Sequence, residues 1–363
     1  MKAMNRYLAA SFAVTLLLAG AALTSGSPVS RAATNPTRVQ MVGQRMIVAF
    51  AGPTPDTRLL ARIRAGQIGG VLLSSGNIRD AAQLTQLTGR LQAAARAGGQ
   101  PPLLIATDQE GGLVRRIPWA PPKASAQELG TSAATHIEAV GRSAGLALGD
   151  AGVNLDLAPV ADVPRSTSNF LEVEHRAFST NRLSVANDSA AFAKGLEEGG
   201  VLPTLKHFPG LGRAGATSTD DAVVRILATR DQIATDLLPY RVALARSLNP
   251  VIMLSTAVYP AYSTSAAAWS RALARTLLRH DLGFRGVEIT DSLTAAATVR
   301  GVTPGVLAIR SAGAGVDLLL VTGSEASSQA TYEAVLGAAR DGRISSVNLR
   351  ASYARILQLK ARI

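Results

Sequence analysis

The sequence contains no cysteine and only four histidines among its 363 residues. Without cysteine, disulfides, thiol nucleophiles and thiolate metal sites are excluded. The four histidines are too few to favour a zinc site built from a histidine cluster. We therefore expect neither a metal nor another cofactor.

Aromatic residues are also scarce, at 4%, and acidic residues are outnumbered by basic ones, 25 to 37, which gives a formal net charge of +12. Hydrophobic residues make up 47% of the chain, which excludes a disordered protein. The basic charge raises the question of nucleic-acid binding, but the arginines are dispersed and aromatic side chains for stacking are few. We do not expect nucleic acid as a partner.

Residues 1–32 have the pattern of a cleaved secretory signal peptide. Lys2 and Arg6 precede an apolar run over residues 9–23, and Ser30 and Ala32 place small residues at the −3 and −1 positions of a cleavage site. A transmembrane anchor is the alternative, but the run is shorter than the roughly 20 residues that span a bilayer. Ala21 stands where a lipoprotein would need cysteine. We expect a secreted, unlipidated chain that begins near residue 33 and whose basic surface suits anionic polymers outside the membrane.

The rest of the chain alternates short apolar runs with helical patterns. The runs predict eight strands, near residues 46–52, 68–74, 103–107, 153–163, 201–206, 251–255, 286–290 and 316–321. Helical spacing recurs near residues 80–95, 131–149, 184–198, 229–247, 270–280, 324–340 and 346–361. Eight strand–helix units predict one α/β domain over residues 33–363, a single (β/α)8 barrel of the TIM type. An open doubly wound sheet is the alternative, but no Gly-rich dinucleotide motif follows the first strand.

Charged residues stand directly after several of these strands, where such barrels keep their active sites. The stretches are Asp108-Gln109-Glu110-Gly111-Gly112, Asp162, Lys206-His207 and Asp291-Ser292. Burying a charge at the end of an apolar strand costs free energy, so such a charge is expected to have an ion-pair partner or a role in binding or catalysis. Structural ion pairs would explain any one of them, but the set as a whole indicates a polar active site.

Five motifs in this order resemble the N-terminal catalytic barrel of glycoside hydrolase family 3. They are Asp108-Gln-Glu-Gly-Gly, Ala158-Pro-Val-Ala-Asp162, Arg176-Ala-Phe-Ser179, Lys206-His-Phe-Pro-Gly210 and Thr290-Asp-Ser292. The likeness covers roughly residues 40–360 and is greatest to single-domain bacterial β-N-acetylglucosaminidases of cell-wall recycling. It implies a β-N-acetylhexosaminidase that removes terminal N-acetylglucosamine from carbohydrate, with cell-wall peptidoglycan as the expected substrate, and a monomer as the favoured state.

The resemblance also implies roles for individual residues. Asp291 matches the nucleophile that forms a covalent glycosyl-enzyme in a retaining mechanism. Asp108 matches an acceptor of sugar hydroxyl protons, and the matching basic sugar-binding positions are Arg116, Arg176, Lys206 and His207. A salt bridge to a neighbouring Asp is the alternative for Arg116 and Arg176, and support of Lys206 is the alternative for His207. We expect Glu110 and Asp162 to be mainly structural, and His136 and His280 to be surface residues.

Two positions depart from the family pattern. Relatives carry a general acid/base histidine in an Asp-Ser-His on the loop after the fifth strand, where this chain has Thr217-Ser218-Thr219. After the sixth strand, Thr256 stands where many relatives have histidine. Asp220 and Asp221 are the only carboxylates between Lys206 and Asp231, so we predict that one of them serves as the acid/base. The alternative is that both only cap the following helix or bind surface arginines.

Two other classes of function remain open at this point. A barrel that lost the acid/base would bind glycans without turning them over, which separates it from an enzyme. Lys206 at a strand end would also suit a Schiff-base lyase, although that chemistry gives the carboxylates no purpose.

Overall fold

The computed structural model describes residues 36–363, and the predicted signal peptide and the domain boundary at residue 33 lie outside these residues. In the described chain, eight parallel strands form one sheet in the order β10-β1-β2-β3-β6-β7-β8-β9. The strands are β1 (Met46–Ala49), β2 (Gly70–Leu72), β3 (Leu104–Thr107), β6 (Leu155–Asp156), β7 (Leu202–Phe208), β8 (Val251–Leu254), β9 (Glu288–Thr290) and β10 (Leu319–Val321).

The sheet closes on itself between its first and last strands. The Thr290 amide donates to the Leu318 carbonyl at 3.0 Å, and the Leu318 amide donates to the Glu288 carbonyl at 2.8 Å. These bonds join β9 to the start of β10, so the predicted barrel is confirmed and the open doubly wound sheet is wrong. All eight predicted strands are present, but the one expected over residues 153–163 is regular over only two residues, and beyond them isolated bonds such as that of the Ala161 amide to the Lys206 carbonyl at 2.6 Å continue the contact with β7.

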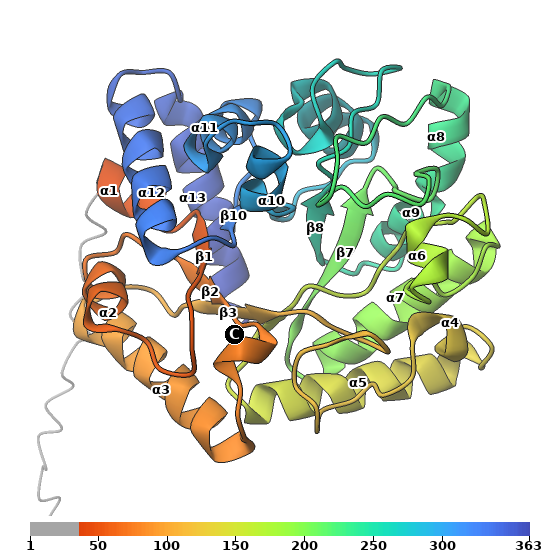
Figure 1. Ribbon diagram of the computed structural model, residues 1–363, viewed down its shortest axis with the longest axis horizontal. Helices are drawn as coiled ribbons and strands as arrows, with labels where there is room; N and C mark the ends of the chain where they lie inside the picture. Colours follow the sequence, from red (N-terminus) through yellow and green to blue (C-terminus); the bar gives the residue numbers. More distant parts are fainter. Residues whose placement is uncertain (1–35) are drawn as a thin grey trace, which may run out of the picture. The chain divides into compact units, whose positions relative to one another are not determined.

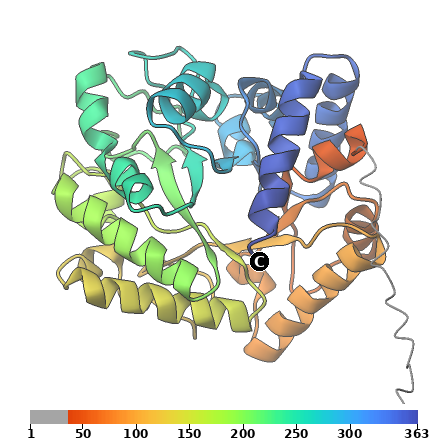
Figure 2. The ribbon, with the colours of Figure 1, turned by 180° about the vertical axis from the view of Figure 1, so that it is seen from behind.

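Helices surround the strands (Figures 1 and 2). The α-helices are α1 (Arg38–Gly43), α2 (Thr57–Arg64), α3 (Ala81–Ala97), α4 (Ala126–Leu129), α5 (Ala134–Asp150), α6 (Phe170–Val173), α7 (Arg182–Glu198), α8 (Arg230–Asp236), α9 (Leu238–Ala245), α10 (Leu293–Thr298), α11 (Pro304–Ala314), α12 (Glu325–Arg340) and α13 (Ser346–Lys360). Two short 3-10 helices, η1 (Ser75–Asn77) and η2 (Ala267–Trp269), and a π-helix, η3 (Ala272–Asp281), complete the set. Several helices begin at side-chain caps, such as Asp80, which accepts from the Gln83 amide at 2.8 Å.

Two clusters of buried apolar side chains stabilise the barrel. One fills its interior with strand residues such as Ile47, Leu104 and Met253, together with Ile356 and Leu359 of α13. In the rear view this C-terminal helix, in dark blue, ends beside the strands (Figure 2). The second and larger cluster lies between the strands and the surrounding helices. With its interior packed, the barrel leaves the loops at the carboxyl ends of the strands free to form a site.

Among residues 36–363, no helix combines the length and the apolar composition needed to cross a membrane. His136 and His280 are exposed, as predicted.

Candidate active site

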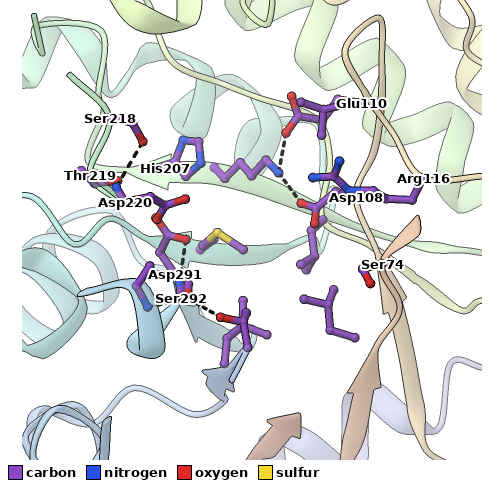
Figure 3. A pocket seen from close by; sticks show the side chains of 18 of the residues that line it. Ser74, Asp108, Glu110, Arg116, His207, Ser218, Thr219, Asp220, Asp291 and Ser292 are labelled. Atoms are coloured by element: carbon purple, nitrogen blue, oxygen red, sulfur yellow. Dashed lines mark hydrogen bonds and ion pairs between the residues drawn. The ribbon is translucent and has the colours of Figure 1, made fainter. Parts of the chain in front are cut away.

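A cavity of about 580 Å³ opens at the carboxyl ends of the strands (Figure 3). This volume falls within the range of about 300–1,000 Å³ typical of small-molecule sites. Seven of the eight predicted site residues line it: Asp108, Arg116, Arg176, Lys206, His207, Asp220 and Asp291. The structure therefore gathers side chains from five separate strand ends and loops around one cavity. Asp221 is the exception, because its exposed side chain lies outside the cavity lining.

Asp108 follows β3 and lies at the end of the cavity that also holds Arg116 (Figure 3). The chain then turns through a small hairpin, β4 (Gln109–Gly111) and β5 (Val114–Arg115). The buried Gln109 side chain fixes the loop that follows, since its Oε1 accepts from the amides of Arg116 and Ile117, both at 3.0 Å. Arg116 forms no ion pair within residues 36–363, so its guanidinium is available to a ligand, and the salt-bridge alternative for it is wrong.

Lys206 enters the cavity from β7 and is neutralised there by two carboxylates. Its Nζ lies 2.8 Å from Asp108 Oδ1 and 2.6 Å from Glu110 Oε1. Burial alone would lower the pKa of Lys206, but Asp108 and Glu110 outweigh burial and raise it. A lysine kept protonated is a poor nucleophile toward a carbonyl, so the geometry disfavours the Schiff-base lyase.

Glu110 connects this lysine to Arg176. Arg176 donates to both Glu110 oxygens, from Nε at 2.8 Å and from Nη2 at 2.9 Å, and Nη1 reaches Glu174 at 3.1 Å. Burial would raise the pKa of Glu110, but Arg176 and Lys206 hold it well below its usual range. Arg176 thus forms the salt bridge given as its alternative, but to the glutamates Glu110 and Glu174 and not to an aspartate. Glu110 has the structural role expected of it while lining the cavity.

His207 is held by Asp162, which lies beneath it. Nδ1 of His207 donates to Asp162 Oδ2 at 2.7 Å, and the amides of His207 and Leu211 also donate to this carboxylate. With Nδ1 bound to Asp162, the His207 ring lines the cavity in a fixed orientation. The predicted structural role of Asp162 in supporting the strand-end loops is confirmed, since its carboxylate binds the amides of His207 and Leu211.

Asp291 directly follows β9, and the Ser292 amide donates to its Oδ1 at 2.7 Å. Asp220 approaches it from the loop after β7, and Figure 3 shows the two carboxyl groups directed toward each other. Part of the Asp220 residue is exposed to solvent. Its carboxyl group is nevertheless partly removed from water, and this burial, followed by the negative charge of Asp291, raises the pKa of Asp220 to about 6. A carboxyl group with a raised pKa thus faces a second one at the same end of the cavity.

Several cavity residues were not anticipated from the sequence: Ser74, Ser75, Gly76 and Thr322. Thr322 directly follows β10 and the other three lie close after β2, and this position near a strand end was the available signal. Ser218, Thr219 and Ser292, which the sequence analysis named without a binding role, also line the cavity. Thr256, at the place of the second missing histidine, is buried outside the cavity lining. Within residues 36–363, no three His, Asp or Glu side chains are grouped so as to hold a metal ion.

Residues 39–359 match the model of the glycosyl hydrolase family 3 N terminal domain. The chain is 35% identical over 331 residues to a protein of Arthroderma benhamiae named an uncharacterized secreted glycosyl hydrolase, with 88% of this chain and 92% of that protein covered. The residues that carried the family resemblance thus lie within a match over most of the chain.

Two solved structures share the fold. A β-N-acetylhexosaminidase from Beutenbergia cavernae superposes with a TM-score of 0.83 at 32% identity, covering 90% of this chain and 99% of that one. A family 3 β-N-acetylglucosaminidase from Paenibacillus sp. str. FPU-7 gives a TM-score of 0.85 at 30% identity over 90% of this chain. This chain spans 63% of the length of the Paenibacillus enzyme.

Proposed function

The chain belongs to glycoside hydrolase family 3, and we propose that it removes non-reducing terminal β-linked N-acetylglucosamine by a retaining mechanism. The names of the Beutenbergia and Paenibacillus proteins support this sugar. The observation that carries the proposal is the pair Asp220 and Asp291, facing each other at one end of a cavity whose other end holds Asp108 and Arg116 (Figure 3). A retaining glycosidase needs one carboxyl group as nucleophile and one as acid/base.

In the first step, the Asp291 carboxylate attacks the anomeric carbon and forms an ester bond to it. The bond from that carbon to the glycosidic oxygen breaks, and Asp220 in its acid form gives its proton to the departing oxygen. The Ser292 amide, 2.7 Å from Asp291 Oδ1, fixes the orientation of the nucleophile.

In the second step, a water molecule attacks the same carbon, and Asp220, now a carboxylate, takes a proton from that water. The ester bond to Asp291 breaks, and the sugar leaves with its β configuration restored. Both residues return to their starting protonation states.

The remaining cavity residues are assigned to sugar binding. Asp108 is 22% exposed in its side chain and accepts from sugar hydroxyls while Lys206 holds one of its oxygens. The His207 ring, held through Nδ1 by Asp162, and the Arg116 guanidinium, which has no ion pair among residues 36–363, add further contacts to sugar hydroxyls. Arg176 acts at a distance, because its ion pair with Glu110 keeps Lys206 aligned with Asp108.

A panel of aryl β-glycosides tests this function with the purified mature protein. We expect faster turnover of the N-acetylglucosaminide than of the glucoside. A preference for the glucoside would show that the proposed substrate is wrong and that the chain acts on a different sugar within the family. Binding of N-acetylglucosamine without turnover of any glycoside would instead favour the non-catalytic glycan-binding barrel.

The pKa of Asp220, raised to about 6, predicts the alkaline limb of the pH profile. The general acid must be protonated in the free enzyme, so kcat/KM for a substrate with a poor leaving group should fall as pH rises through about 6. A dinitrophenyl glycoside needs no proton donor, and its glycosylation step should lack this limb. A profile that stays flat to pH 8 with the poor leaving group would count against Asp220.

We also propose that residues 1–32 direct export and are removed, and that the mature protein acts in peptidoglycan turnover. The basic n-region and the apolar run over residues 9–23 support export. N-terminal sequencing of protein recovered from the medium or the cell wall should give a sequence that begins near Ala33. An intact Met1 on cytoplasmic protein would refute export and cleavage.

Release of N-acetylglucosamine from purified wall fragments tests the physiological substrate.

A further inference from the structure

A nearly buried carboxylate, Asp236, is held between two arginines at the base of the loop that carries Asp220. Arg213 Nε donates to Asp236 Oδ2 at 2.6 Å, and Arg165 Nε donates to Oδ1 at 3.1 Å. The Asp236 side chain is only 6% exposed, whereas the arginines are 22% and 29% exposed. Arg213 belongs to the loop itself, Arg165 to the segment between β6 and α6, and Asp236 to the last turn of α8.

The first part of the Asp220 loop is fixed to the segment between β6 and α6. The Arg165 amide donates to the Gly212 carbonyl at 2.8 Å, and the buried Asn169 side chain donates to the carbonyls of Leu211 and Ala214 at 3.0 and 2.8 Å. A Cβ at Gly212 would lie 1.9 Å from the Val163 carbonyl oxygen, so only glycine permits this approach. Residues 211–214 are therefore anchored before the loop turns toward the cavity.

The far part of the loop is anchored as well. The Ile226 amide donates to the Val258 carbonyl, and the Val258 amide donates to the Val224 carbonyl, both at 2.9 Å. Asp220 lies between the two anchors on a short turn in which its own amide donates to Ser218 Oγ at 3.1 Å. The position of Asp220 relative to Asp291 thus depends on where these anchors stand.

Asp236 lies at the junction of α8 and α9, which share Leu237 as a cap, so its charge is near the C-terminus of one helix and the N-terminus of the next and no net helix-dipole effect explains it. Burying its carboxylate costs free energy, which the two guanidinium groups offset. Buried ion groups of this kind often contribute little net stability while they hold a defined arrangement of chain segments. Here the segments joined are the stem of the loop, its neighbour and α8.

We propose that Asp236, with Arg165 and Arg213, forms a positioning cluster that holds Asp220 at the distance from Asp291 and substrate that proton transfer requires. This inference rests on the proposed acid/base role of Asp220. The cluster touches neither substrate nor reacting atoms, and it acts by fixing the stem from which Asp220 projects.

The test compares leaving groups in Asp236→Asn, which keeps the shape of the side chain and removes its charge. We expect kcat/KM to fall about 10–100-fold for substrates with poor leaving groups, since a displacement of about 1 Å can cost 10²-fold. The glycosylation rate with a dinitrophenyl leaving group, and the rate of labelling by a 5-fluoro glycosyl fluoride, should stay within about threefold of the parent, because neither needs the acid. Arg213→Gln should show the same selectivity, and Arg213→Lys should restore part of the loss.

Asp317 offers a matched control at the opposite end of the barrel. It is a fully buried carboxylate that also binds two arginines, Arg279 at 2.7 Å and Arg355 at 2.6 Å. Asp317→Asn, or Arg355→Gln if the former does not fold, should lower the melting temperature without changing the ratio between good and poor leaving groups.

Equal losses on all leaving groups in Asp236→Asn and Arg213→Gln, or no loss on any, would overturn the positioning cluster. Asp220→Ala separates this result from a failure of the proposed function. If Asp220→Ala is selective for poor leaving groups and the cluster variants are not, only the positioning inference fails. If Asp220→Ala matches the parent on every substrate, the acid/base assignment fails first.

Discussion

Replacing Asp291 with asparagine is expected to lower kcat/KM by at least about 10³-fold on every substrate, because the amide cannot form the ester to the anomeric carbon. The loss should not depend on the leaving group, since the nucleophile is needed whether or not the glycosidic oxygen requires a proton. Steady-state kinetics with aryl and alkyl N-acetylglucosaminides measures it.

The fold and sugar binding should survive this change. Asp291 is half-buried, and its Oδ1 accepts a single hydrogen bond, from Ser292, that an amide oxygen also accepts. Circular dichroism and binding of N-acetylglucosamine by calorimetry provide the control. If the kcat/KM of Asp291→Asn stayed within tenfold of the parent value, Asp291 would not be the nucleophile.

Replacing Asp220 with alanine is expected to act selectively. General acid catalysis contributes typically about 10²–10⁴-fold, so kcat/KM for an alkyl glycoside should fall by that factor, whereas glycosylation by a dinitrophenyl glycoside should be nearly unchanged. Deglycosylation of the activated substrate then becomes limiting, because no base assists water. Added azide should restore turnover and yield a glycosyl azide of retained configuration.

Asp221→Ala is the matched control, because it removes the neighbouring carboxylate that lies outside the cavity. It should behave like the parent on all leaving groups and show no azide effect. If the selective loss appeared in Asp221→Ala and not in Asp220→Ala, the two assignments would have to be exchanged.

Much of the barrel was predictable because its strands are short, buried on both faces and therefore continuously apolar. The same logic located Asp108 and Asp291, which directly follow β3 and β9, and Lys206, which lies in the last part of β7, since parallel strands bring their carboxyl ends to one side of a barrel. The short helix α2 and the Ala- and Gly-rich α11 (Pro304–Ala314) were not predicted. The pattern of α2 is amphipathic and follows the capping residue Asp56, so its signal was present in the sequence. The helix α11 consists mostly of small and apolar residues, so packing against the rest of the barrel decides it.

The choice between Asp220 and Asp221 was beyond sequence reasoning for a physical reason. Adjacent residues on a turn point in different directions, and the turn is set by contacts with distant segments, such as the bonds of Val224 and Ile226 to Val258. The link of Arg176 to Lys206 through Glu110 is of the same kind. It joins residues far apart in the sequence, so the residue types were visible but their partners were not.

The most direct test of the two-step mechanism is to trap its intermediate. Incubation with the 5-fluoro derivative of N-acetylglucosaminyl fluoride slows hydrolysis of the glycosyl-enzyme more than its formation, so the adduct should accumulate as activity is lost. Peptide mass spectrometry should then find one sugar per chain, on the peptide and residue of Asp291. A sugar attached to Asp108, or unaltered protein in a reaction that still releases fluoride, would contradict the covalent role of Asp291.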